Sequence, residues 1–354
     1  MDLAARRLRA AEALAATEAD RLLVTSLVNV RWLTGFTGSN AVATLTTDGT
    51  AVLLTDGRYR DQAQAECPGV EVLVGRDLEG MAAGTAADAR WAVETHEMTV
   101  DTHRQLVAYL SQEPIPAGRL IETLRVVKDA GEVELLRQAC EISVAALTAT
   151  WEGSLVGRTE REVARDLERR MVDLGADGVA FDTICAAGEN SAIPHHQPSD
   201  RELRRGDLLK IDFGALVAGY HADCTRTVVL GPATDWQRET HAAVLQAQSL
   251  GVSMLRTDVT PAEIDAAVRA DLDAGGWGEH FTTGLGHGVG LQIHEDPFFG
   301  PHQSGRLTDR TVVTMEPGIY LVGRGGVRIE DTVCVTPNGP EVLTPAPASL
   351  LEIG

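Results

Sequence analysis

The sequence predicts a mixed α/β (α+β) chain of two domains, and three observations lead to this prediction. With 354 residues, the chain is long for one hydrophobic core and comfortable for two. Its first third alternates short β-rich segments with helical ones and separates them by turn dipeptides such as Asp48-Gly49 and Pro68-Gly69. From Asp129 onward, apolar residues recur every three or four positions, which is typical of long amphipathic helices.

The boundary between the two domains is indicated by residues 113–118. Pro114 and Pro116 have no backbone N–H, so no helix continues through this stretch. We place the boundary just after it and expect domains at residues 1–124 and 125–354.

The elements of the first domain follow in order from the same signals. Charged residues interrupt the Ala-rich stretch Met1–Asp20, which favours an amphipathic helix over a signal peptide. Strands are then expected at Arg21–Ser26, Ala41–Thr47, Ala51–Thr55, Val70–Val74 and Trp91–Glu94. Helical patterns lie between them at Arg58–Glu66 and His103–Gln112.

Three helices of the second domain are predicted together with their first residues. They span Thr159–Leu174, Asp235–Leu255 and Thr260–Ala274. Thr159 followed three residues later by Glu162 is a capping-box pattern. Thr260-Pro261 is an N-cap followed by proline at the first helical position, where its missing N–H costs nothing.

Composition excludes several classes of partner. The formal charge of −20 would repel phosphate backbones and anionic lipid, so we expect neither nucleic acid nor a membrane as a partner. No segment approaches the ~20 apolar residues that span a bilayer. The five cysteines are odd in number and widely spaced, which favours free thiols in a reducing compartment. Without an export signal, a cytoplasmic location is expected.

Two carboxylates lie opposite each other in a predicted β-hairpin. If its turn centres on Val217-Ala218, Asp212 and Asp223 are cross-strand partners whose charges repel. A shared proton, an arginine or a bound cation would compensate this repulsion. A solvated pair at the sheet edge and a general acid with a general base remain as alternatives.

A second acid pair and a glycine-rich segment follow. Glu316 and Glu330 are equidistant from Gly323, which predicts another hairpin that brings two acids together. Between the two hairpins, glycine alternates with larger residues over Thr283–His294, which predicts a strand that another backbone or a ligand can approach closely. His287 lies on this segment, and a bulge or turn is needed for His294 to serve the same site.

Four carboxylates and one histidine on strands suit a dinuclear site for hard to borderline divalent cations. The predicted ligands are Asp212, Asp223, His287, Glu316 and Glu330. Two cations ~3.5–4 Å apart would lower the pKa of a bridging water and polarise a scissile carbonyl.

The order of these residues resembles the creatinase/prolidase/methionine aminopeptidase superfamily. The matching motifs are Lys210-Ile-Asp-Phe-Gly-Ala215, Ala222-Asp-Cys-Thr-Arg-Thr227, Gly286-His-Gly-Val-Gly-Leu291, Met315-Glu-Pro-Gly-Ile-Tyr320 and Arg328-Ile-Glu-Asp331. The resemblance implies a pita-bread catalytic domain after a creatinase-type N-terminal domain. It also implies two divalent ions, Mn²⁺ before Co²⁺ or Zn²⁺, and a homodimer.

The resemblance further implies roles for individual residues. Asp212 chelates one metal, Asp223 and Glu330 bridge both, and His287 and Glu316 complete the second site. Glu316 also accepts a proton from the attacking water. The remaining positions match substrate contacts: His195 and His294 at the reacting carbonyl, and Phe181, Ile184 and Arg328 in the pocket.

Two departures from the family pattern bear on the substrate. Thr283 replaces a histidine of many relatives, and Phe298 stands where many prolidases carry an arginine that grips a dipeptide's carboxylate. Without that charge-assisted anchor, we expect an Xaa-Pro aminopeptidase that acts on longer proline-containing peptides. An Xaa-Pro dipeptidase (prolidase) is the alternative, and a peptide-binding protein that lost catalysis is the remote one.

Overall fold

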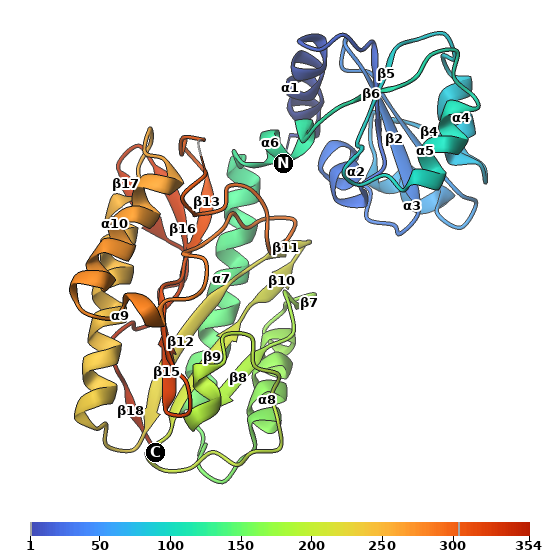
Figure 1. Cartoon of the computed structure of the whole chain (residues 1–354). Coiled ribbons are helices and arrows are strands. Elements are labelled where there is room, and N and C mark those ends of the chain that lie inside the picture. The colour runs from blue at the N-terminus through green and yellow to red at the C-terminus, as the bar shows by residue number, and fades with distance from the viewer. Residues whose placement is uncertain (1, 304) are drawn as a thin grey trace. The chain divides into compact units, whose positions relative to one another are not determined.

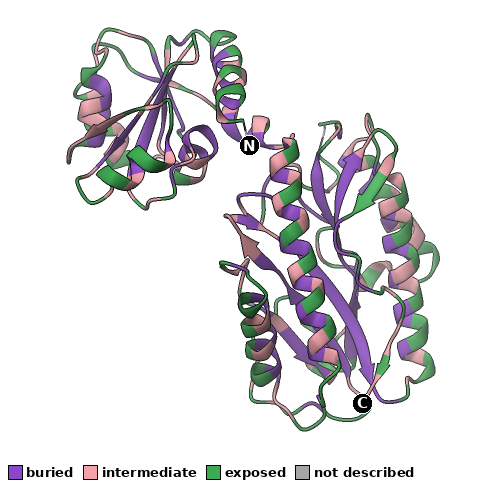
Figure 2. Cartoon of the chain, turned by 180° about the vertical axis from the view of Figure 1, so that it is seen from behind, coloured by how far each residue is buried: buried purple, intermediate pink, exposed green. Residues whose placement is uncertain are grey.

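A computed structural model of the protein describes residues 2–303 and 305–354. It divides into two compact units, Met1–Arg125 and Val126–Gly354 (Figure 1). In each unit the strands are mostly buried, while the helices carry exposed residues on their outer sides (Figure 2).

The first unit is built on a six-stranded sheet in the order β4-β3-β2-β1-β5-β6. Its strands are β1 Arg21–Val24, β2 Ala41–Thr46, β3 Ala51–Thr55, β4 Glu71–Val74, β5 Trp91–Val93 and β6 Ile115–Pro116. Its helices are α1 Leu3–Ala15, α2 Leu27–Thr34, α3 Arg60–Glu66, α4 Leu78–Gly84, α5 Val100–Val107 and α6 Leu120–Arg125. The five strands predicted from the sequence are confirmed within a few residues at their ends.

The helices of the first unit depart from the prediction in two ways. Helix α5 begins at Val100 and not at His103, because the Thr99 side chain accepts a hydrogen bond from the Thr102 N–H and caps the helix there. Helices α2 and α4 were not predicted, since each spans two turns and is too short for its apolar period to be recognised.

The second unit contains four long helices. They are α7 Ala130–Trp151, α8 Glu160–Asp173, α9 Asp235–Met254 and α10 Pro261–Ala274, and two short 3₁₀ helices are η1 Gly188–Ala192 and η2 Gly278–His280. The predicted capping box is confirmed: Thr159 accepts from the Glu162 N–H, and Glu162 accepts in return from the Thr159 N–H. Thr260 caps α10 in the same manner, with Pro261 at the first helical position.

The described strands of the second unit form two main sheets, here called leaves, and two smaller sheets, β11-β10-β7 and β14-β15. One leaf has the order β18-β12-β9-β8 and the other β13-β16-β17. The strands are β7 Gly178–Val179, β8 Ile184–Ala187, β9 Leu208–Phe213, β10 Ala215–Val217, β11 Tyr220–His221, β12 Cys224–Leu230, β13 Val312–Met315, β14 Gly318–Leu321, β15 Gly325–Arg328, β16 Asp331–Thr336, β17 Gly339–Val342 and β18 Glu352–Ile353.

Each leaf buries one face against its own helices. Leu209, Ile211 and Phe213 of β9 pack in a core with residues of α7 and α8, as their alternation predicts. Strands β13 and β16 share a second core with α9 and α10. Figure 1 shows the two helix pairs on opposite sides of the strands. Asp212, which alternates with these core residues along β9, therefore points away from α7 and α8.

The register of the first hairpin differs from the predicted one by two residues. The turn centres on Ala218 and Gly219, whose φ values of 46° and 80° both lie in the left-handed region that a tight two-residue hairpin turn requires. Asp212 consequently lies opposite Thr225. Asp223 is displaced by one diagonal step from Asp212 and does not face it directly.

The second hairpin is confirmed in the predicted register. Gly318 pairs with Arg328 and Met315 with Asp331, so the two strand pairs share a turn centred on Gly323. Glu316 and Glu330 lie at matching positions between the two pairs.

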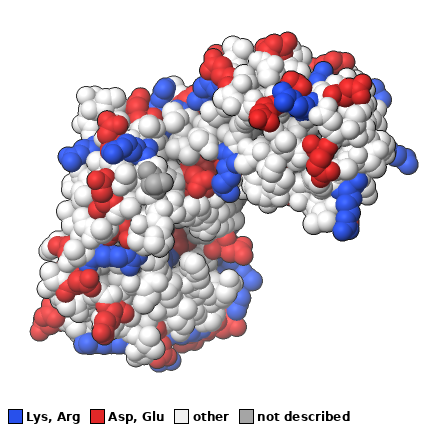
Figure 3. All heavy atoms as spheres, turned by 45° about the horizontal axis from the view of Figure 1, so that its top comes forward, with Lys and Arg blue, Asp and Glu red and all other residues white. Residues whose placement is uncertain are grey.

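Two expectations drawn from composition can be compared with the structure. The five cysteines are buried and unbonded, as predicted. Among the described helices, none is long and apolar enough to cross a membrane. Acidic and basic side chains are interspersed on the face shown in Figure 3.

Candidate metal centre

The five predicted ligands line one cavity of about 440 Å³ inside the second unit. Asp212 comes from β9, and Asp223 directly precedes β12. Glu316 follows β13 and Glu330 precedes β16. The cavity is also lined by Phe181, Ile184, His195, Thr283, Gly284, Gly286, His287, Ile293, His294, Phe298, Phe299 and Arg328. Every residue predicted to bind metal or substrate therefore borders the same space.

Three of the predicted ligands converge tightly. Asp223, His287 and Glu330 each place one ligand atom within 4.8 Å of the others, and all three are buried. His287 Nε2 lies 3.3 Å from Glu316 Oε1 and 3.5 Å from Asp223 Oδ2. Its Nδ1 lies 3.0 Å from the Gly288 carbonyl oxygen and, as the donor, would leave Nε2 free as a ligand.

The carboxylates destabilise one another without a cation. Burial and the neighbouring Glu330 raise the pKa of Asp223 well above its usual range. Burial and the neighbouring Glu316 do the same to the pKa of Glu330. Asp212 Oδ1 is buried and has no hydrogen-bond donor. The site thus combines carboxylate oxygens, one imidazole nitrogen, several negative charges close together and one buried oxygen without a donor. Divalent cations bind such a set of ligands.

One arginine balances part of this charge. Arg328 is 2 % exposed and donates from Nη2 to Asp212 Oδ2 at 2.5 Å. It also donates to the Thr225 hydroxyl, the Tyr320 hydroxyl and the Pro194 carbonyl. Arg328 was predicted to bind substrate, but these four hydrogen bonds show that its guanidinium is largely occupied by the protein.

Thr225 is a member of the site that the sequence did not single out. Its hydroxyl donates to Glu330 Oε2 at 2.6 Å and accepts from Arg328 Nε at 3.0 Å. It thereby links the Glu330 carboxylate to the Arg328 guanidinium. Its place opposite Asp212 follows only from the observed hairpin register.

The glycine-rich segment does not form the predicted regular strand. It runs beside β13, where Thr314 N–H donates to the His287 carbonyl and Glu316 N–H to the Leu285 carbonyl. A side chain at Gly286 would lie 2.2 Å from the Thr314 carbonyl oxygen, so the alternating glycines permit this close approach.

The turn that His294 requires is present. Glu295 N–H donates to the Gly288 carbonyl at 2.9 Å, and the chain reverses between them. The His294 ring centroid consequently lies 4.4 Å from that of His287. His294 is exposed at the cavity, as is His195 on the loop after η1.

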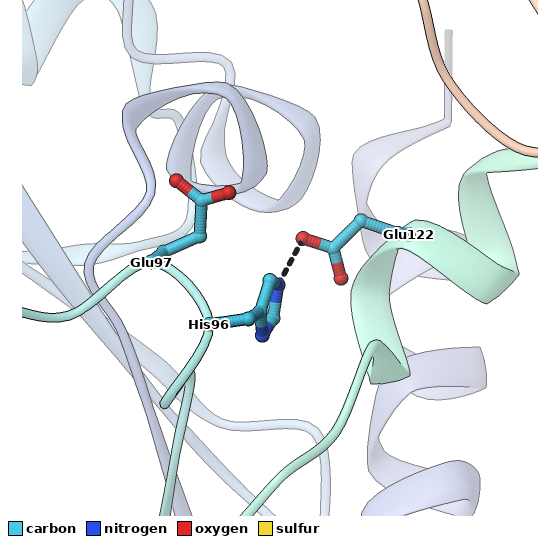
Figure 4. A group of neighbouring side chains, drawn as sticks. All are labelled: His96, Glu97 and Glu122. Atoms are coloured by element: carbon cyan, nitrogen blue, oxygen red, sulfur yellow. Dashed lines mark hydrogen bonds and ion pairs between the residues drawn. The ribbon is translucent and has the colours of Figure 1, made fainter.

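A second group of potential ligands lies in the first unit. His96, Glu97 and Glu122 place ligand atoms within 4.8 Å of one another. Figure 4 shows one hydrogen bond in this group, from His96 Nε2 to Glu122 Oε1 at 2.9 Å. The same Glu122 oxygen accepts from Asn29 Nδ2, which also donates to Glu94. We interpret the group as part of the hydrogen-bond network of this unit.

Comparisons with known proteins agree with this organisation. The sequence pattern of metallopeptidase family M24 matches residues 134–337, and that of the creatinase/prolidase N-terminal domain matches residues 6–127. An Xaa-Pro dipeptidase of Pyrococcus furiosus is 44% identical over 232 residues, which cover 66% of this chain and 67% of the relative. The structure of an Xaa-Pro dipeptidase from Bacillus anthracis superposes with a TM-score of 0.95 at 33% identity, covering 99% of this chain and 100% of that one. An X-Pro aminopeptidase from Thermotoga maritima gives 0.88 at 34% identity, covering 97% and 100%.

Proposed function

The chain belongs to metallopeptidase family M24 and carries the creatinase/prolidase N-terminal domain before a pita-bread catalytic domain, and on that premise we propose that it hydrolyses the peptide bond preceding proline. The observation that carries the proposal is the convergence of Asp223, His287 and Glu330, whose ligand atoms lie within 4.8 Å of one another in a cavity large enough for a short peptide.

We propose that two divalent cations would be held by the five predicted ligands, Asp212, Asp223, His287, Glu316 and Glu330. Mn²⁺ is our first choice because four of the five ligands are carboxylates, and Co²⁺ or Zn²⁺ would also accept this donor set. Bound cations of this kind supply Lewis acidity, which polarises the scissile carbonyl and lowers the pKa of an attacking water.

The protein's own groups then orient the substrate and move the proton. Glu316 lies beside His287 and is partly exposed at the cavity, so it is placed to accept a proton from the attacking water. His195 and His294 face the cavity from separate loops, and we propose that they donate hydrogen bonds to the reacting carbonyl. Phe181 and Ile184 offer an apolar wall for the proline ring.

We propose dipeptides as the preferred substrates, because the Pyrococcus furiosus relative and the Bacillus anthracis structure are both named Xaa-Pro dipeptidases. This reverses the order predicted from the sequence. The Xaa-Pro aminopeptidase remains the second candidate on a specific observation. Phe298 borders the cavity in the region where many prolidases carry an arginine, and Arg328 already donates four hydrogen bonds within the protein.

A matched series of substrates tests both candidates. Xaa-Pro, Xaa-Pro amide and Xaa-Pro-Yaa share the scissile bond and differ only in the charge and length after proline. A dipeptidase cleaves the first and leaves the other two, whereas an aminopeptidase cleaves the tripeptide efficiently. The assay is run on protein stripped with a chelator and reloaded with Mn²⁺, Co²⁺ or Zn²⁺. Hydrolysis that survives complete metal removal would refute the proposed mechanism.

A further inference from the structure

A fully buried carboxylate lies behind the loop that carries His195. Glu160 is the first residue of α8 and is 0 % exposed. Its Oε1 accepts from the Ala187 N–H at 2.8 Å and from Asn190 Nδ2 at 3.0 Å. Its Oε2 accepts from Ser199 N–H at 3.0 Å and Ser199 Oγ at 2.6 Å, and His196 Nε2 lies 2.8 Å away.

All these partners belong to residues 187–199, a segment of low regularity. Strand β8 ends at Ala187, and after it the segment contains only the short 3₁₀ helix η1 among its described residues. A segment of this kind has little backbone pairing of its own to fix its shape. Glu160 joins its two ends, since Ala187 and Ser199 both donate to the same carboxylate.

Two buried basic side chains, Lys210 and Arg328, hold the middle of the segment. Lys210 Nζ donates to the carbonyls of Ile193 at 2.7 Å and Pro194 at 3.2 Å. Arg328 Nη1 donates to the Pro194 carbonyl at 3.2 Å. The carbonyl groups before His195 thus accept hydrogen bonds from Lys210 and Arg328, and the residue after it, His196, bonds to the Glu160 carboxylate.

We propose that Glu160 is a positioning residue that fixes the His195 imidazole at the reacting carbonyl. This inference rests on the proposed function, in which His195 contacts the substrate. Glu160 lines neither the cavity nor the predicted metal site, so it acts through the loop. A carboxylate is required because it only accepts hydrogen bonds, and its two oxygens face donors on both sides.

Replacing Glu160 by glutamine is the informative change. The side chain keeps its shape, but one oxygen becomes an NH₂ group that points at donors. The matched control is Glu162→Gln, which removes an exposed carboxylate of the same helix whose hydrogen-bonded partner is Thr159. Hydrogen exchange in metal-free protein should quicken at least about tenfold across residues 187–199 in E160Q and stay unchanged there in E162Q. Unchanged exchange in E160Q would overturn the proposal without reference to activity.

Activity supplies the second readout through a double-mutant cycle with His195→Asn. We expect E160Q to lower kcat/KM for an Xaa-Pro substrate by about 10- to 100-fold, as outer-shell changes commonly do, while Mn²⁺ affinity stays within about threefold. In the H195N background the same change should cost less than about twofold. Equal losses in both backgrounds would show that Glu160 does not act through His195.

A milder variant covers the case in which E160Q does not fold. Ser199→Ala removes one donor to Glu160 Oε2 and leaves the carboxylate in place. It should give a smaller loss of kcat/KM that again disappears in H195N, and an additive loss would overturn the proposal. A wild-type enzyme that cleaves no Xaa-Pro bond would refute the proposed function instead, and the exchange experiment would still decide the role of Glu160 in the loop.

Discussion

Neutralising one carboxylate of the metal centre should have opposite effects on stability with and without metal. Asp223→Asn replaces a buried anion by a neutral side chain of nearly the same shape. In metal-free protein the Asp223 and Glu330 oxygens lie within 4.8 Å, which corresponds to a repulsion of about 3.5 kcal/mol at an effective dielectric constant of about 20. Protonation of one acid relieves part of this energy. We therefore expect the metal-free variant to be more stable than wild type by about 1–3 kcal/mol.

Bound metal should make the wild type more stable than the variant. At a cation concentration of 1,000 times Kd, the wild type gains about 4.1 kcal/mol of unfolding free energy. The variant lacks one of the five proposed ligands, so its gain should fall below about 1 kcal/mol. Urea unfolding of both proteins in chelator and in saturating Mn²⁺ measures all four values.

Asp331→Asn is the matched control, since Asp331 follows Glu330 and is also buried. Its oxygens accept from Arg226 at 2.6 Å, Gln248 at 2.7 Å and Thr344 at 2.8 Å. Neutralising it removes favourable interactions and should destabilise the protein in both conditions. The reasoning fails if D223N is less stable than wild type in chelator, or if it gains as much from metal as wild type does.

Three further predictions concern stability outside the five ligands. Lys128→Met should lower the free energy of unfolding, measured in urea, by about 3–5 kcal/mol, because it removes the ion-pair partner that lies 2.7 Å from the buried Glu295. Lys128→Arg should recover part of this loss. A loss below about 1 kcal/mol in Lys128→Met would contradict the prediction. Burial and the neighbouring Arg226 lower the pKa of His241 to about 4, so the unfolded chain binds its proton first as pH falls below about 6.5. Wild type should accordingly lose about 2 kcal/mol more than His241→Gln between pH 7.5 and 5, and parallel pH profiles of unfolding would refute this. Gly286→Ala should lower both stability and kcat/KM, because its Cβ would lie 2.2 Å from the Thr314 carbonyl oxygen, whereas Gly284→Ala meets open space and should unfold like wild type.

The sequence predicted those parts of the structure whose signals are local. Helices α8 and α10 begin where Thr159 and Thr260 cap them, because a capping box lies within four consecutive residues. The pairing register around Gly323 also followed from sequence spacing, since one turn sets the register of the strands on either side. The short helix α2 gave no such signal.

The first hairpin was predicted from local sequence, but its exact register was not. Its turn was expected at Val217-Ala218 and lies at Ala218-Gly219, because the backbone needs two residues with positive φ and glycine at 219 adopts one without strain. The shift moved the partner of Asp212 from Asp223 to Thr225. Both acids still reach one cavity, since a displacement of two residues keeps a side chain on the same face.

By itself, the sequence determined the kinds of groups in this protein: five candidate ligands for hard to borderline cations, two further histidines, and motifs that place them in order along the chain. Only the tertiary structure showed which other side chains form hydrogen bonds with these groups and orient them. Thr225 donates a hydrogen bond to Glu330, which lies 105 residues further along the chain. Glu160 accepts hydrogen bonds from a loop that begins 27 residues after it. Such contacts depend on which faces of distant strands and helices are buried together. The spacing of residues along the chain does not predict such contacts. They form because a buried charge without a hydrogen-bond partner costs free energy.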